Sequence, residues 1–160
     1  MNKVEEYEIN RNTILITPHY DPVYRTRILE KNREIYCTKT SLQIIEEACI
    51  NGGASMNGRK QAMEKILQTK VKVPIPVDPS IGVFLFPNKS PKEMNCYWFS
   101  FFHIKEYLKS SHDGNKTEII FTNKMKQVID TSFFTFRRQM YLTSLAIAML
   151  SRNAWLKKDD

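Results

Sequence analysis

The chain contains cysteine, histidine and carboxylate side chains that could act as nucleophiles, acids, bases or metal ligands, but none of them has the spacing typical of a catalytic or metal site. Cys49, Cys96 and His103 are candidates for a zinc site or a cysteine–histidine nucleophile pair, yet no short ligand repeat such as Cys-x-x-Cys is present. The carboxylate pairs Glu5-Glu6 and Glu46-Glu47 lack an organised neighbourhood of histidine, aspartate or serine. No phosphate-binding glycine loop or nucleophile elbow occurs. The sequence therefore predicts no catalytic residue, no metal and no cofactor, and we expect a protein that is not an enzyme.

The excess of Lys and Arg indicates function more clearly than these cysteines, histidines and carboxylates do. The 160 residues carry 24 Lys+Arg against 17 Asp+Glu, a net charge of +7. Gly58-Arg59-Lys60 follows a glycine-bearing loop and is expected to open a helix, whose free N–H groups and positive dipole end favour a phosphate. We interpret Arg59 and Lys60 as phosphate or groove contacts on DNA and Lys65 as supporting charge. A solvated helix face is the alternative for the lysines from Lys65 onward.

A second group of cations lies in the C-terminal quarter. Lys124 is at the tip of a predicted hairpin and Lys126 just beyond it, and two-stranded basic ribbons can enter a DNA groove. Arg137-Arg138, near the start of the last predicted helix, resembles a phosphate contact. Solubilising charge for the two lysines and an interhelical salt bridge for the arginines remain open as alternatives.

Eight short strands are predicted from the sequence. They lie at 6–9, 13–17, 24–29, 34–38, 83–86, 97–104, 117–122 and 125–129. The first four form two hairpins, and the last two form a third around Asn123-Lys124. Segment 97–104 is apolar on both faces, as expected of a central strand. The proline-rich stretch 74–91 is expected to be a crossover within one domain.

Helices are predicted where apolar residues recur at helical spacing. The first starts at Ser41 as its cap and stops at Asn51-Gly52-Gly53, and the second runs from about Arg59 to Gln68. The last runs from Phe133 to about Trp155 and is apolar around much of its girth, which predicts contact with another subunit. The chain is thus expected to form one α+β domain over residues 1–160, with a mixed or antiparallel sheet, two central helices and a long C-terminal helix. The contiguous aromatics are expected in the core or in a subunit interface, and stacking on unpaired bases is the alternative.

The sequence shows neither an export signal in its first residues nor an apolar run long enough for membrane insertion. The first ten residues are polar and acidic, and no apolar run approaches the ~20 residues that span a bilayer. The three cysteines have an odd count and no framework spacing. We therefore expect a cytoplasmic protein with no membrane partner.

Three stretches together resemble the bacterial competence transcription factor family (ComK). The first is 49–60, with its Cys, Gly, Ser and Gly-Arg-Lys pattern. The second joins 77–80 to Phe84-Leu85-Phe86-Pro87, and the third combines Cys96, Trp98, Ser100, 103–107 and 118–123. The resemblance extends from about Tyr7 to Trp155.

The resemblance implies a regulator that binds AT-rich double-stranded promoter DNA, mostly through the minor groove, as a dimer or tetramer. It also implies control by an adaptor that delivers the protein to a Clp protease. A narrow A-tract groove has an enhanced negative potential that attracts Arg and Lys, which suits a basic chain. Longer members of the family continue beyond the point where this chain ends, with a segment linked to adaptor recognition and transcription activation. The resemblance therefore supports DNA binding more strongly than it supports these two functions.

Three other interpretations stay open at this point. One is a protein–protein interaction module, either a DNA-inactive or truncated regulator that oligomerises with a full-length relative, or a basic adaptor. Another is an enzyme on nucleic acid, which needs a carboxylate cluster that the sequence does not show. The third places residues 41–68 as a helix-turn-helix in the major groove, and we rank it lower because the expected loop 51–58 is long for a 3–4-residue turn.

Overall fold

The computed structural model describes residues 2–110 and 114–156. Its elements in chain order are β1 Asn2–Val4, β2 Thr13–Pro18, β3 Thr26–Glu30, β4 Glu34–Cys37, α1 Ser41–Asn51, α2 Met56–Leu67, β5 Ile75–Asp78, η1 Pro79–Ile81, β6 Val83–Pro87, β7 Trp98–Ser100, η2 Phe101–His103, β8 Ile104–Lys109, β9 Thr117–Phe121, β10 Lys126–Ile129 and α3 Phe133–Leu156. The predicted α+β class, with two helices before a long C-terminal one, is confirmed.

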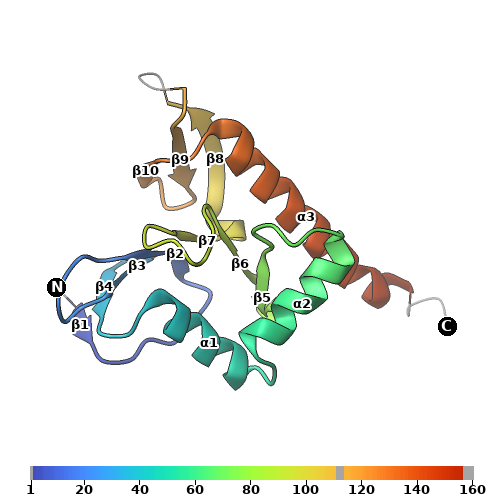
Figure 1. The fold of residues 1–160 in the computed structure, drawn as a ribbon, viewed down its shortest axis with the longest axis horizontal. Coiled ribbons are helices and arrows are strands. Elements are labelled where there is room, and N and C mark those ends of the chain that lie inside the picture. The colour runs from blue at the N-terminus through green and yellow to red at the C-terminus, as the bar shows by residue number, and fades with distance from the viewer. Residues whose placement is uncertain (1, 111–113, 157–160) are drawn as a thin grey trace.

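The strands form two sheets. The larger has seven strands in the order β1-β4-β3-β2-β7-β6-β5, antiparallel except for the parallel β1–β4 pair. The smaller is the antiparallel meander β10-β9-β8. One apolar core lies between the seven-stranded sheet and α1, and a second joins its other face to the small sheet and α3 (Figure 1). The large sheet therefore separates α1 from the β8–β10 meander, and a third core that includes Met63, Leu67 and Ala146 packs α2 against α3.

The N-terminal hairpin prediction is half right. The strand at 13–17 forms, but 6–9 is not a strand, and the edge of the sheet is closed by β1 instead. Tyr7 is buried, and its hydroxyl donates to Glu30 Oε2 at 2.5 Å and lies 2.7 Å from Thr13 Oγ1. Because Tyr7 is anchored inside the molecule by these contacts, segment 6–9 does not pair with a neighbouring strand.

Two further strand predictions need correction. The proline-rich crossover contains a second strand, β5, because its Pro76 lies in an edge strand where a missing N–H is tolerated. Segment 97–104 is indeed central at β7, which pairs with β2 and β6, but it breaks at η2 and continues as β8 in the other sheet. This one segment carries the chain from the large sheet to the small one.

The N-terminal ends of both central helices differ from the expected ones. Thr40, not Ser41, caps α1 through a capping box with Gln43. Ser55 caps α2, so that helix starts at Met56 and Arg59 lies in its second turn. The connecting loop shrinks to Gly52–Ser55, and the length objection to a helix-turn-helix arrangement of 41–68 no longer holds.

The long helix α3 joins the two sheets through an aromatic cluster. Phe136 is fully buried, and its ring centroid lies 5.5 Å from that of Phe86, 5.3 Å from that of Phe99 and 5.3 Å from that of Tyr107. The interpretation of the aromatics as core is confirmed for these residues, while Phe134 on the same helix is exposed. Across the described residues, no helix is long and apolar enough to cross a membrane.

Candidate nucleic-acid interface

Arg59, the leading candidate from the sequence, is held by main-chain carbonyls. Its Nη2 donates to Cys49 O at 2.8 Å, its Nη1 to Pro76 O at 2.8 Å and its Nε to Ala54 O at 3.2 Å. Gly52 leaves the space for this arrangement, because a Cβ there would lie 2.8 Å from Nη2. The guanidinium therefore ties the end of α1 and the α1–α2 loop to β5.

The amino terminus of α2 is also filled by the protein's own groups. The Met56 N–H donates to the Glu46 carboxylate at 2.9 Å, and the Gly58 N–H donates to Ser55 Oγ at 3.0 Å. The Arg59 N–H already bonds to Ser55 O within the helix. The expected phosphate site at this terminus thus contains a carboxylate of α1, which repels a second anion.

Lys60 and Lys65 are the candidates on α2 whose charges stay available. Both are exposed, and neither forms an ion pair with any residue that the structure describes. Their helix, α2, lies beside α1 in Figure 1. They can attract a polyanion without first breaking a protein contact.

The two arginines of α3 are engaged within the protein. Arg138 donates to Val71 O at 3.2 and 3.3 Å and to the Gln139 amide oxygen at 2.7 Å, which fixes the segment after α2. Arg137 donates from Nε to Tyr141 OH at 2.8 Å, with its guanidinium 5.1 Å from the centre of that ring. The interhelical salt bridge weighed for this pair is absent from the described residues.

The β9–β10 hairpin carries the remaining candidates. Lys124 is exposed at its tip, and Lys126 lies 4.0 Å from Glu118 across the two strands. In Figure 1 this hairpin and α2 are far apart, with the large sheet between them. The seven predicted DNA-binding residues therefore do not form one surface on a single copy of the chain.

Sequence reasoning missed two cations that the fold brings to the hairpin tip, Arg11 and Lys31. Each lies in a turn, like Lys124, and turn position was the one signal in the sequence. Hydrogen bonds link the three turns, as in the contact of Asn123 Nδ2 with Lys31 O at 3.3 Å. Recognising the group requires the sheet order, which the sequence alone does not supply.

Comparison with known proteins places the chain in a family. The model of the ComK protein family matches residues 4–154. The competence transcription factor of Bacillus subtilis (strain 168) is 34% identical over 155 residues, which cover 96% of this chain and 74% of that protein. The chain belongs to the ComK family. No solved structure gives a significant match.

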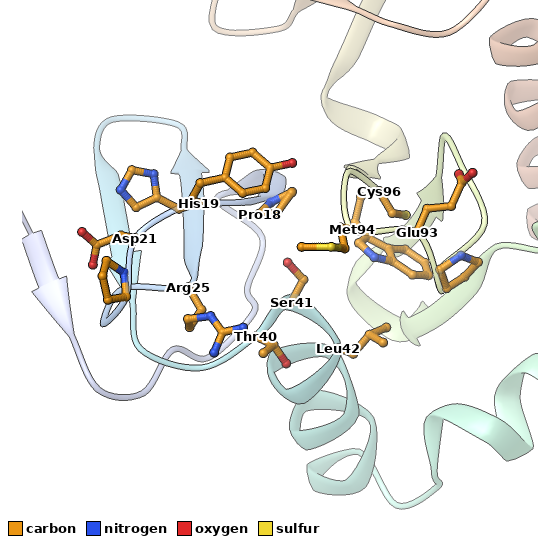
Figure 2. Close-up of a pocket in the computed structure, with 14 residues that line it drawn as sticks. Pro18, His19, Asp21, Arg25, Thr40, Ser41, Leu42, Glu93, Met94 and Cys96 are labelled. Atoms are coloured by element: carbon orange, nitrogen blue, oxygen red, sulfur yellow. The ribbon is translucent and has the colours of Figure 1, made fainter.

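The surface of this ComK-family chain also contains a cavity, which is the place to look for a reaction centre. A cavity of about 660 Å³ opens between the 18–25 loop, the start of α1 and the 91–96 loop. Figure 2 shows Met94 and Ser41 extending into it from opposite walls, with Arg25 directed toward Thr40. Charged residues such as Arg25 and Glu93 line it together with apolar ones such as Leu42, and this mixture does not specify a ligand.

Cys49 and Cys96 are buried and are poor candidates for a nucleophile or a metal ligand in this ComK-family fold. Burial raises the pKa of Cys96, beside the cavity, to about 11, and it raises the pKa of Cys49 to about 11 as well. Both thiols are therefore protonated near neutral pH, and a thiolate is the form that attacks substrates and binds metal. Among the described residues, no group of His, Cys, Asp and Glu could hold a metal ion.

Proposed function

We propose that this chain is a DNA-binding regulator of competence-type genes that recognises AT-rich promoter DNA mainly through the minor groove, acting as an oligomer in the cytoplasm. The family match over residues 4–154 carries the proposal, because it relates the chain to a transcription factor rather than to an enzyme. The net charge of +7 supports it. Phosphate neutralisation by Lys and Arg supplies most of the sequence-independent affinity for DNA.

Within this proposal the candidate residues divide into two groups. Lys60, Lys65, Lys124 and Lys126 have exposed ammonium groups that can contact DNA directly. Arg59 and Arg138 already donate to main-chain carbonyls, so their part in DNA binding is to hold the backbone near the lysines of α2. Arg137 is exposed and donates to the Tyr141 hydroxyl on its own helix, so it can contact a phosphate directly. The helix-turn-helix arrangement of α1 and α2, with its recognition helix in the major groove, is the competing mode.

A mobility-shift comparison of AT-rich and GC-rich duplexes of equal length, at several salt concentrations, tests the proposal. We expect tighter binding to the AT-rich duplex at every salt concentration and a steep loss of affinity as salt rises. Equal affinity for both duplexes would remove sequence preference. Absence of binding at low salt would leave the protein–protein interaction module as the better interpretation.

Self-association is proposed from the outer face of α3. A stripe of exposed apolar residues runs along it, comprising Phe134, Tyr141, Leu145, Met149 and Leu156. Contiguous apolar surface of this kind is typical of contacts with another protein. A second copy of the chain, or a full-length relative, would cover it. No residue is proposed for a Clp-protease adaptor, which stays an expectation from the family resemblance.

Leu145→Asp should dissociate the oligomer, because it places a charge in the centre of the stripe. Leu145 is 47% exposed, so the change should leave the monomer folded. Ser144→Asp adds the same charge one position away, outside the stripe, and should leave assembly unchanged. Sedimentation velocity over a range of concentrations measures both. A wild-type monomer at every concentration would refute self-association.

A further inference from the structure

Three turns far apart in the sequence meet at one end of the two sheets. They are residues 10–13, 30–33 and 122–125, which we call the three-turn cluster. The Lys31 N–H donates to Asn12 O at 2.9 Å, and Asn123 Nδ2 donates to Lys31 O at 3.3 Å. Each turn is thus bonded directly to the next, across both sheets.

His103 adds two further links between the turns. Its Nε2 lies 2.5 Å from Arg11 O, and its Nδ1 lies 3.4 Å from Thr122 Oγ1. The Thr122 N–H in turn donates to His103 O at 2.8 Å. His103 is a positioning residue, because its ring fixes the first turn against the third. The backbones that carry the turn cations are therefore held at fixed separations.

The cluster carries cations without matching acids. Arg11, Lys31, Arg33 and Lys124 are all exposed. Arg33 pairs with the buried Glu30 at 2.7 Å. The other three form no ion pair with any described residue. Like charges held together repel one another, and a polyanion bound at this end removes that repulsion.

The backbone of Lys124 gives a second, independent observation. Its φ is +74°, in the left-handed region that a residue with a Cβ adopts at a cost and that glycine adopts freely. The favoured residue at such a hairpin tip is glycine or asparagine. A lysine here strains the turn and supplies an ammonium group, and strain of this kind gathers at functional sites.

We propose that the three-turn cluster is a phosphate anchor for duplex DNA, in which Arg11, Lys31 and Lys124 each contact one backbone phosphate. The inference rests on the proposed function and extends it, because it names a contact surface separate from the lysines of α2. Rigid turns suit this task, since phosphate contacts fix the position of a protein on the duplex. The hydrogen bonds among the turns set the spacing of the backbones that carry the three cations.

The test compares two triple variants that each lower the net charge by three. One is Arg11→Ala/Lys31→Ala/Lys124→Gly. The control is Arg25→Ala/Lys92→Ala/Lys116→Ala, which removes exposed cations that also lack an ion pair among the described residues. Arg25 precedes β3 and Lys116 precedes β9, whereas the cluster follows both strands. The two variants therefore remove cations from opposite ends of the same strands.

Binding of a labelled AT-rich duplex is measured for wild type and both variants across salt concentrations. Each lost phosphate contact lowers the slope of log K against log[salt] by about 0.9 in magnitude, so the cluster variant should lose about two to three units. The control variant should lose less than about one unit through the general field of the protein. Urea unfolding midpoints confirm that both variants fold.

Lys124→Gly alone separates binding from folding. It relieves the backbone at the hairpin tip, so its urea midpoint should equal or exceed that of wild type, while its salt slope falls by about one unit. Equal slope losses in the two triple variants, or an unchanged slope in the cluster variant, would overturn the anchor and leave the proposed function standing. Failure of the wild-type chain to bind at low salt would overturn the proposed function, and the anchor with it.

Discussion

Phe136→Ala should lower the free energy of unfolding by about 3–5 kcal/mol, the largest effect that we expect from a single substitution. The ring is fully buried and contacts aromatic rings of β6, β7 and β8, so its removal opens a cavity where α3 meets both sheets. Each aromatic contact contributes roughly 0.5–1.5 kcal/mol beyond the buried area. Urea denaturation measures the change.

Phe134→Ala is the matched control on the same helix. That ring is 64% exposed, and it contacts the Phe133 ring and the ammonium of Lys109, which lies 5.0 Å from its centre. Its removal should cost less than about 1 kcal/mol. If the two substitutions shifted the urea midpoint equally, α3 would not join the sheets through this cluster.

Arg59→Ala should lower the free energy of unfolding by about 2 kcal/mol or more. The substitution removes a charged donor from the carbonyls of Cys49, Ala54 and Pro76, and hydrogen bonds to charged groups each contribute about 1.5–3 kcal/mol. Arg59→Lys should recover little of the loss, because one ammonium cannot reproduce the planar fork of donors.

Lys60→Ala is the control for Arg59. Lys60 is exposed and unpaired in the described part of the chain, so its removal should change stability by no more than about 0.5 kcal/mol and should lower the DNA salt slope by about one unit. A wild-type urea midpoint for Arg59→Ala, together with weaker DNA binding, would return Arg59 to the role of a direct DNA contact.

Much of the architecture follows from local signals in the sequence. The β3–β4 and β9–β10 hairpins, α1 and α3 lie close to their predicted positions, because turn residues and apolar periodicity agree there. Segment 6–9 has a strand-like pattern, yet its Tyr7 reaches Glu30 in a distant strand, which no local pattern reveals. The parallel partner of β4 is equally a product of long-range pairing.

The candidate site depends on distant contacts even more strongly. A cation beside a helix start predicts a phosphate contact, but Arg59 turns back onto carbonyls that lie up to 17 positions away along the chain. Arg11 and Lys31 gain interest only once the sheet order brings their turns to Lys124. The sequence therefore predicts the net charge of the chain well. It predicts poorly which Lys and Arg side chains are exposed and which are engaged in contacts within the protein.

Binding to inosine-substituted DNA distinguishes recognition through the minor groove from recognition through the major groove. An inosine–cytosine pair presents the minor-groove acceptors of an A·T pair and the major-groove pattern of a G·C pair. We expect the chain to bind an inosine–cytosine version of the AT-rich duplex nearly as tightly as the A·T original, and both more tightly than the G·C duplex at the same salt concentration. Binding of the inosine–cytosine duplex as weakly as the G·C duplex would contradict minor-groove recognition and favour α2 in the major groove.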